Sequence, residues 1–336
     1  MTRYAGQVRF GPLGEEGQAR LRAARVAVVG LGALGSTLAG HLARAGAGFL
    51  RLCDRDFVEL GNLQRQALYD EEDARASLPK AVAAASKLAR INSEVALDPR
   101  VCDVSGANAE EIARDVDLVL DGTDNFETRF VLNDACVKLG RPWVYGGCVG
   151  SRGMVMAVLP GEGPCFACLA GAPPLPGTAP TCETAGILNT VPGVVASLQA
   201  CEAIKILSGR RQALARGLMT VDLWANTFRL LDVPRAAGCE ACVRRSFRHL
   251  GAGPGAVAAL CGRDAVQVTP PPGSRLDLAE AERRLGSLGP VRRNAYLLRF
   301  SAEGCEITLF ADARAIIRGT GDAARARSLY SRYVGA

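Results

Sequence analysis

The sequence contains very little histidine, and this limits the catalytic chemistry open to it. Only two of its 336 residues are histidine, His41 and His249. Catalysis by a Ser-His-Asp or Cys-His arrangement would have to use one of these two. His41 lies on a predicted helix, where a packing role is the simpler interpretation, and His249 lies in a glycine-rich stretch. A histidine-activated nucleophile is therefore a poor candidate for the activity.

The sequence also lacks long apolar runs. No stretch of about 18 residues is free of charged or polar residues, so we expect no membrane span. The N-terminus carries Arg3 and Arg9 and no apolar core of a signal peptide, which predicts a cytoplasmic protein. Lysine is scarce, and the arginines that supply most of the positive charge are scattered along the chain. A contiguous nucleic-acid-binding patch is therefore not indicated.

The composition is that of a globular protein with one large or two smaller domains. Hydrophobic residues make up 49% of the chain and charged residues 22%, which is ordinary for a protein with a well-packed core. Twelve cysteines are present without an expected secretion signal. That combination favours metal or thiol chemistry over a disulfide scaffold.

Short apolar strands alternate with helices through the first half of the chain. The run VAVV is followed by a glycine turn and a helix, and Pro79 fits the first turn of a later helix. This alternation predicts an α/β fold with a Rossmann-like, doubly wound and mostly parallel sheet. The expected elements are a helical arm at 1–22, strands at 26–29, 49–53, 95–101 and 117–121, and helices at 36–45, at 79–91 and after 125.

The pattern changes after about residue 150, where the remaining strands suit an antiparallel continuation of the sheet. A proline- and glycine-rich stretch, 169–181, predicts an irregular crossing segment. The expected elements are strands at 153–159, 218–222 and 228–233 and a helix at 194–207.

The C-terminal part predicts a small α+β domain of its own. We expect a main domain over residues 1–250, a linker region over 251–273 and the small domain over 274–336. The linker contains a strand-like DAVQV between two glycine- and proline-rich stretches. The elements expected after it are a helix from 276, strands at 295–300, 306–310 and 315–318, and a last helix at 322–333.

Four cysteines form two C-x-x-C pairs, Cys165 with Cys168 and Cys239 with Cys242, and seventy residues lie between the pairs. Two such pairs supply four thiolates, which is the ligand set of a structural zinc site with no open position. The alternatives are a redox C-x-x-C or two unrelated pairs. A redox motif normally lies at a strand-to-helix turn, and the first pair carries no helix signal. We predict a structural zinc ion that staples the two regions together.

The sequence GLGALG, which follows VAVV, has the G-x-G-x-x-G spacing of a nucleotide-binding turn. Its glycines indicate a tight turn and close approach to a phosphate, which suits NAD or another nucleotide. Asp54 ends the next strand, where an acid binds ribose hydroxyls of NAD or ATP alike. The turn alone therefore leaves both ligands open.

Charged residues farther along the chain favour ATP. Arg65 lies in GNLQRQ, and Lys80 lies at a helix N-terminus, where its charge adds to the helix dipole on a polyphosphate. Asp124 and Asn125 follow a strand end, and the Asp124 carboxylate is a suitable ligand for Mg²⁺. A triphosphate with Mg²⁺ needs these charges, whereas NAD does not. Hydride transfer by an NAD dehydrogenase would also need an acid/base group that the sequence does not offer.

The combination of motifs resembles the ThiF/MoeB/HesA family, the bacterial relatives of ubiquitin-activating enzymes. The matching stretches are GLGALG, GNLQRQ, LPK, LDGTDN, the two C-x-x-C pairs and TCETAG, over roughly residues 3–245. The resemblance implies an ATP-binding adenylyltransferase that is usually a homodimer. Its substrate would be the C-terminal Gly-Gly carboxylate of a ubiquitin-like sulfur-carrier protein for thiamine, molybdopterin or thiouridine biosynthesis, with a sulfurtransferase or cysteine desulfurase as a further partner.

The resemblance also implies roles for residues of this chain. A nucleotide loop, a ribose ligand, phosphate ligands, an Mg²⁺ site and a zinc site are all represented. The assigned residues are Gly30, Gly32, Ala33 and Gly35 for the loop, Asp54 for ribose, Asn62, Arg65 and Lys80 for phosphates, Asp124 with its neighbour Asn125 for the Mg²⁺ side, and Cys165, Cys168, Cys239 and Cys242 for zinc.

Cys182, in TCETAG, falls where the family often has a reactive cysteine. A thiol after a flexible glycine- and proline-rich segment can move to an acyl adenylate. The hypothesis is a thioester or persulfide link to the carrier, and the alternative is an inert small residue in a loop.

The sequence departs from the family pattern near its N-terminus. Family members often begin R-Y-x-R-Q, and the resemblance implies that the second arginine reaches the ATP of the partner subunit. Here that position is Gly6, and Arg9 or Arg3 would have to substitute. Two alternative functions therefore stay open: a same-fold enzyme that adenylates a tRNA or a peptide, and a degenerate protein that docks the carrier without turning over ATP.

Overall fold

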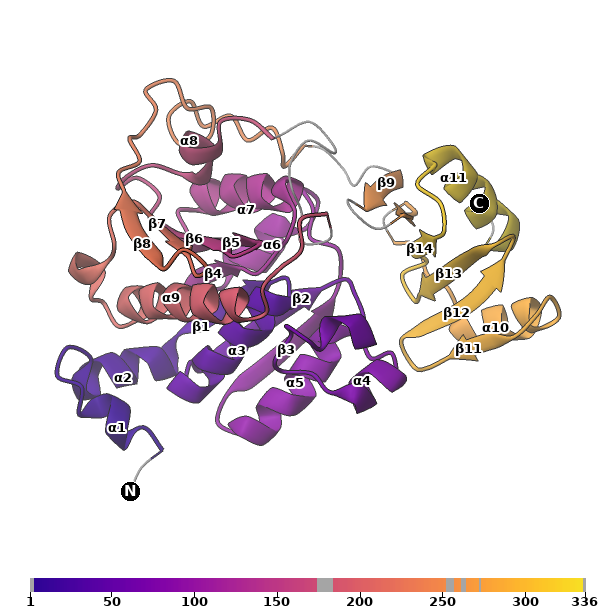
Figure 1. The fold of residues 1–336 in the computed structure, drawn as a ribbon, viewed down its shortest axis with the longest axis horizontal. Coiled ribbons are helices and arrows are strands. Elements are labelled where there is room, and N and C mark those ends of the chain that lie inside the picture. Colours follow the sequence, from indigo (N-terminus) through magenta and orange to yellow (C-terminus); the bar gives the residue numbers. More distant parts are fainter. Residues whose placement is uncertain (1–2, 174–183, 252–256, 261–263, 272, 335–336) are drawn as a thin grey trace. The chain divides into compact units, whose positions relative to one another are not determined.

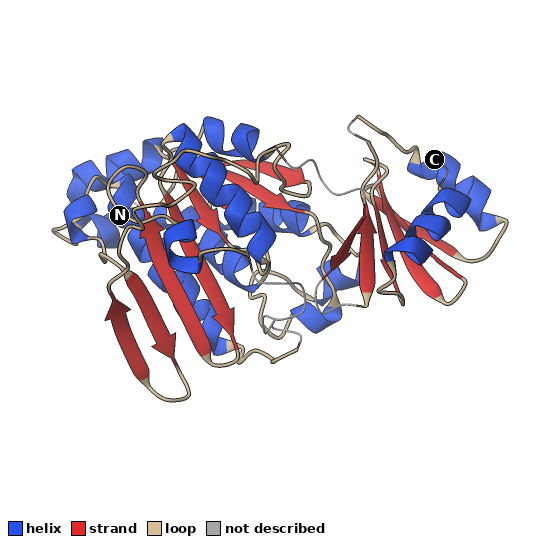
Figure 2. Ribbon diagram, turned by 90° about the horizontal axis from the view of Figure 1, so that it is seen from above, coloured by secondary structure: helices blue, strands red, loops and turns tan. Residues whose placement is uncertain are grey.

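The computed structural model describes residues 3–173, 184–251, 257–260, 264–271 and 273–334. These residues form two compact units, one within 3–173 and 185–251 and the other within 257–334. Each unit has a sheet and a core of its own (Figures 1 and 2).

The first unit is built on an eight-stranded sheet in the order β3-β2-β1-β4-β5-β6-β7-β8. The first five strands in this order are parallel, and the last three continue the sheet in antiparallel fashion, as expected from the sequence. The chain order reverses between β1 and β4, which is where open α/β sheets bind ligands. The strands are β1 Arg25–Val29, β2 Phe49–Asp54, β3 Ala96–Val101, β4 Leu118–Asp121, β5 Trp143–Val149, β6 Arg152–Val158, β7 Leu218–Asp222 and β8 Thr227–Leu231.

Helices cover both faces of this sheet. Helices α3, α5 and α9 pack on one face, and α6, α7 and α8 pack on the other (Figure 1). The helices are α1 Ala5–Val8, α2 Gly14–Ala23, α3 Ala33–Ala45, α4 Glu71–Arg75, α5 Lys80–Ile91, α6 Ala109–Arg114, α7 Phe126–Leu139, α8 Phe166–Ala170 and α9 Thr190–Leu207, with 3-10 turns at Leu60–Asn62 and Arg211–Ala213.

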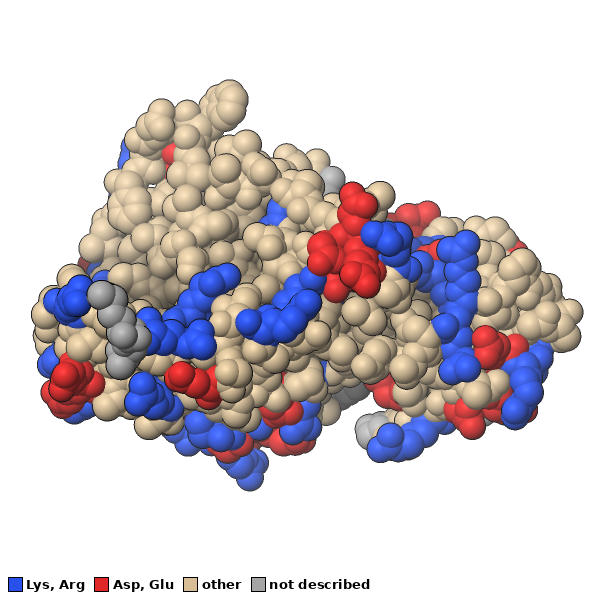
Figure 3. Space-filling model, turned by 90° about the horizontal axis from the view of Figure 1, so that it is seen from below, with Lys and Arg blue, Asp and Glu red and all other residues tan. Residues whose placement is uncertain are grey.

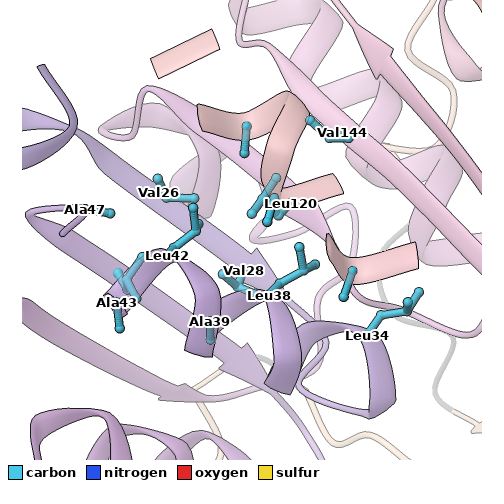
Figure 4. Packing of buried hydrophobic residues seen from close by; sticks show 14 of the residues in the cluster. Val26, Val28, Leu34, Leu38, Ala39, Leu42, Ala43, Ala47, Leu120 and Val144 are labelled. Carbon is cyan, nitrogen blue, oxygen red and sulfur yellow. The ribbon is translucent and has the colours of Figure 1, made fainter. Parts of the chain in front are cut away.

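Helix α3 is held to the sheet by a dry apolar contact. Leu38 and Leu42 of α3 are fully buried against Val26 and Val28 of β1 (Figure 4). Each such side chain contributes about 1.5–3 kcal/mol when it leaves water. This packing sets the position of the N-terminus of α3, and therefore of the loop that precedes it.

Helix α9 begins earlier than the sequence pattern predicts, at Thr190 rather than Val194. Val191 and Val195 are fully buried, and Pro192 is tolerated because the first turn of a helix needs no backbone donor. Among the described residues, α9 is the helix long and apolar enough to span a membrane by length and composition, and 56% of it is buried. Its apolar character is explained by packing over β5 and β6.

Four elements of the first unit are not among those expected from the sequence: α4, α6, β5 and α8. β5 contains Gly146 and Gly147, and glycine is depleted in strands. A Cβ at Gly146 would lie 2.2 Å from the Gln199 side chain, so long-range packing requires this glycine. Helix α8 is only five residues long and begins directly after Cys165. The first C-x-x-C pair therefore does carry a helix, contrary to the sequence-based expectation.

The second unit is a six-stranded antiparallel sheet in the order β11-β12-β13-β14-β10-β9. Helices α10 and α11 pack on one face of it, where Leu285 and Leu329 are buried against Ile307 and Ile317. The elements are β9 Val257–Leu260, β10 Ala265–Val268, α10 Leu278–Gly286, β11 Val291–Arg293, β12 Leu297–Ala302, β13 Cys305–Phe310, β14 Ala315–Arg318 and α11 Ala323–Tyr333.

Strands β9 and β10 fall within residues 251–273, the stretch expected to form a linker. β10 pairs with β14, and Ala265 lies opposite Arg318. The partner strand is some fifty residues away in sequence, so local pattern cannot reveal the pairing. The structure thus places part of this stretch inside the second sheet.

Candidate functional site

The glycine loop after β1 is tightly packed. Gly30 has φ +81°, and a Cβ on Gly35 would lie 1.7 Å from the Gly30 carbonyl oxygen. Only glycine fits at these two positions. Gly32 differs, because its Cβ would have no neighbour nearer than 3.8 Å. The packing of the protein itself therefore leaves space above Gly32, where α3 begins with Ala33 and its N-terminal amides suit an anion.

Asp54 ends β2 beside this loop. Its carboxylate accepts hydrogen bonds from the backbone N–H of Leu31 at 2.6 Å and of Asp56 at 2.7 Å. Burial raises the pKa of Asp54, and the charge of Lys80 opposes that rise. Asp54 thus shapes the glycine loop, and its oxygens retain further acceptor capacity for a ribose.

Lys80 begins α5 and is buried. Its Nζ lies 3.2 Å from Oδ2 of Asp56, a residue that the sequence analysis did not single out. The signal was available, because Asp56 follows Asp54 by two residues at the same strand end. Arg55, also not singled out, lies between them, and its guanidinium donates to Asp103 at 3.0 Å.

The GNLQRQ stretch folds back on itself. Asn62 is buried and its side chain accepts from the backbone N–H of Glu59 at 3.3 Å, which closes a 3-10 turn. The guanidinium of Arg65 is part-exposed and donates to the Gly61 carbonyl at 3.1 Å. The predicted phosphate contacts of Asn62 and Arg65 stay predictions.

Asp124 and Asn125 follow β4 at the same sheet edge. Asp124 is exposed, and Asn125 caps α7 by accepting from the N–H of Thr128 at 2.8 Å. The preceding Gly122 packs directly on the glycine loop, since its Cβ would lie 2.4 Å from the Gly30 carbonyl oxygen. The structure therefore brings together the loop after β1, Asp54 after β2 and the Asp124 stretch after β4.

A buried cluster below this edge was also missed by sequence reasoning. Asp121 and Arg129 form a buried ion pair, with Nε and Oδ2 separated by 3.1 Å, and Gln199 of α9 donates to the Asp121 carbonyl at 2.9 Å. Local pattern could not assign this role, because an arginine in a predicted helix is usually solvent-exposed.

The four cysteines of the C-x-x-C pairs meet in space, as the sequence predicted. Their sulfur atoms all lie within 4.8 Å of one another, and Cys168 Sγ is 3.5 Å from Cys242 Sγ. Four ligands at tetrahedral zinc–sulfur distance would be spaced by about 3.8 Å, whereas a disulfide requires about 2 Å. The donor set fits a closed tetrahedral metal site. Cys182 lies outside the described residues, and its covalent role stays a prediction.

The ThiF family model matches residues 4–241. The sulfur carrier protein ThiS adenylyltransferase of Bacillus subtilis is 41% identical over 99% of both chains. The sulfur carrier protein adenylyltransferase of Thermus thermophilus is 41% identical over 72% of this chain and 90% of its own length. The crystal structure of E. coli MccB, 21% identical, superposes with a TM-score of 0.64 over 72% of each chain and shows the same fold.

Proposed function

This chain belongs to the ThiF family, and from that premise we propose that it uses ATP to adenylylate the C-terminal Gly-Gly carboxylate of a ubiquitin-like sulfur carrier. The observation that carries the proposal is the full-length similarity to a ThiS adenylyltransferase, which includes the second unit. That relative also favours the thiamine branch over molybdopterin or thiouridine synthesis. A cytoplasmic location is part of the proposal.

The proposed reaction is an attack of the carrier carboxylate on the α-phosphorus of ATP. A carboxylate oxygen–phosphorus bond forms, the bond between the α-phosphorus and the bridging oxygen breaks, and pyrophosphate leaves. No proton has to be moved, which suits a chain with two histidines. The protein's task is to position the reactants and to offset negative charge.

Each part of the crevice suits one part of the nucleotide. The glycine loop and the N-terminus of α3 would hold phosphate, with Lys80, Arg65 and Asn62, and Asp54 would hold the ribose. Asp124 offers an exposed carboxylate, the hard oxygen donor that Mg²⁺ prefers. A bound Mg²⁺ would supply neutralisation of the charge that develops on the phosphates.

The cysteine cluster is proposed to hold a structural zinc ion. All four positions of a tetrahedral ion would be filled by thiolates, so no position is left for a substrate. The metal would fix α8 to the turn that follows β8.

An exposed apolar strand is the proposed docking surface for the carrier. β8 is the edge strand of the sheet, and Phe228 and Leu230 on one of its faces are 60% and 54% exposed. Trp224, in the β7–β8 turn, is 79% exposed. Because β6 and β7 run antiparallel to their neighbours, this turn lies at the sheet edge that carries the nucleotide crevice. A carrier seated here would have its tail near the site.

We expect the double change Phe228→Asp and Leu230→Asp to raise the KM for the carrier at least about tenfold, since a handful of apolar anchors dominate such interfaces. ATP binding without carrier should be unchanged. Leu231→Asp is the matched control, because Leu231 lies on the other face of the same strand and is 45% exposed. Equal KM effects in both variants would contradict the proposed surface.

The N-terminal arginines bear on the proposed homodimer. Arg3 is held within its own chain, where it donates to the Ile91 carbonyl at 3.0 Å and lies 3.7 Å from Glu94. Arg9 is exposed. Family members often have an arginine at the position that Gly6 occupies here. We therefore propose that Arg9, and not Arg3, takes over the role of that arginine and reaches the partner subunit's nucleotide.

Arg9→Ala is expected to lower the pyrophosphate exchange rate, because a cationic group at the phosphates offsets the negative charge that develops there. Gly6→Arg in the Arg9→Ala background should restore much of the rate, because a side chain at Gly6 meets nothing within 4 Å. The measurement is exchange at saturating carrier, with dimerisation followed by light scattering. Unchanged exchange in Arg9→Ala would show that another group serves the phosphates.

The proposed function is tested by ATP–pyrophosphate exchange with Gly-Gly-ended carriers from the same genome. Exchange with an intact carrier, and none with the same carrier lacking its last two residues, is the expected result. ATP binding without exchange for any carrier would favour the docking-protein alternative. Exchange that depends on tRNA would favour the alternative of an enzyme that adenylates a tRNA. On the face that Figure 3 presents, basic and acidic side chains lie interspersed, which does not favour that alternative.

A further inference from the structure

A buried arginine lies beneath the loop that carries Asp124. Arg129 of α7 pairs with Asp121, the last residue of β4, at 3.1 Å. Its Nη2 also donates to the carbonyls of Thr123 at 2.7 Å and Gly146 at 3.3 Å. One guanidinium thus joins the end of β4, the loop after it and β5.

The partners of Arg129 extend this network. The Asp121 carboxylate accepts from the backbone N–H of Thr123 at 2.9 Å and from its hydroxyl at 2.6 Å. Gln199 of α9 donates to the carbonyls of Asp121 at 2.9 Å and Val144 at 3.2 Å. The residue just before Asp124 is therefore held through both its backbone and its side chain.

The chemistry of this position requires arginine. The guanidinium is flanked by the rings of Phe126 and Tyr145, with centroids 5.5 and 5.3 Å away. Burial acts to lower the pKa of Arg129, but the Asp121 charge prevails and raises it, so the group stays charged. A planar fork with five donors can serve three acceptors in different directions, which the single ammonium of lysine cannot do.

We propose that Arg129 is a positioning residue that sets the 122–124 loop so that the Asp124 carboxylate meets the metal–nucleotide complex. The inference rests on the proposed function of Asp124. Arg129 is buried and donates to the Asp121 carboxylate and to the carbonyls of Thr123 and Gly146, so it acts through the loop rather than on the substrate. Gln199 of α9 also holds the end of β4, through its hydrogen bond to the Asp121 carbonyl.

Arg129→Lys keeps the charge and loses the fork. We expect it to raise the Mg²⁺ concentration needed for half-maximal exchange about tenfold or more, with a smaller change in kcat. Thr123→Val, which removes only the hydroxyl contact to Asp121, should shift the same quantity in the same direction by less. This second variant keeps the test open if Arg129→Lys folds poorly.

Arg51→Met is the matched control for loss of a buried arginine. Arg51 is as buried as Arg129, with side chains 9% and 8% exposed, and it also pairs with carboxylates, Asp98 and Asp115. Asp115 precedes β4 whereas Asp121 ends it, so the Arg51 pair lies toward the opposite edge of the sheet. Arg51→Met should lower the melting temperature and leave the Mg²⁺ dependence unchanged. An equal Mg²⁺ shift in this control would overturn the proposal.

A double-mutant cycle with Asp124→Asn gives the sharpest result. The measured quantity is the affinity for ATP in the presence of Mn²⁺, determined by calorimetry without carrier. If Arg129 acts through Asp124, adding Arg129→Lys to the Asp124→Asn variant should not change this affinity further. Fully multiplicative effects would overturn the inference. Wild-type protein that binds ATP with Mn²⁺ but shows no exchange would refute the proposed function. The double-mutant cycle would then still test whether Arg129 positions Asp124. Wild-type protein that binds no nucleotide would overturn both.

Discussion

Cys239→Ser is expected to lower the metal content from one zinc ion per chain to nearly none and to reduce the melting temperature by roughly 10 °C. Cys239 is buried, and its Sγ lies 3.6 Å from that of Cys165. Without the metal, the buried Cys165–Cys239 pair and the part-buried Cys168–Cys242 pair would no longer fix α8 to the turn after β8. Structural zinc contributes about 10 kcal/mol or more in peptides that fold around it. A partial loss of about 4 kcal/mol corresponds to roughly 10 °C in a unit of this size.

The matched control for this prediction is Cys136→Ala. Cys136 is fully buried in α7 and lies outside the cluster. The control should retain one zinc ion per chain, as measured by elemental analysis. A chelator should lower the wild-type melting temperature to that of Cys239→Ser and leave the variant unchanged. Full zinc content in Cys239→Ser would mean that the four cysteines do not form the site.

Asp124→Asn is expected to lower ATP–pyrophosphate exchange at least about 100-fold, since a metal ion on the transferring phosphates accounts for several kcal/mol of barrier. Because Asp124 is exposed, its change to the neutral amide should leave the melting temperature within about 1 °C. The loss should be partly recovered at high Mg²⁺ or with Mn²⁺. This separates a weakened metal site from a damaged fold.

Glu127→Gln is the control for Asp124→Asn. Glu127 is an exposed acid three residues farther along, in the first turn of α7, and its change removes the same charge from the same stretch. Exchange should stay within about twofold of wild type. A similar loss in both variants would show that general charge near α7, rather than the Asp124 carboxylate, controls the rate.

The alternation of apolar strands and helices predicted the doubly wound sheet because burial on both faces demands short apolar strands, as in β1 and β4. β5 escaped prediction for a physical reason. Its Gly146 makes room for Gln199, which is more than fifty residues away in sequence. The strand-like DAVQV forms β10 as expected, but its pairing with β14, some fifty residues farther along the chain, could not be predicted from local pattern. Propensity reports local preference, and these elements exist through long-range contact.

The candidate site also has parts that local sequence predicts and parts that depend on long-range contacts. By itself, the sequence determined the chemical groups: the glycine loop, the acids at two strand ends, Lys80 at a helix N-terminus and two pairs of thiols at metal-binding spacing. These follow from local backbone geometry and from spacing within a few residues. Only the tertiary structure decided that Asp56 faces Lys80, and that Arg129, Asp121 and Gln199 join beneath Asp124. Buried polar groups must find partners wherever the fold places them, and those partners come from elements far apart in the chain.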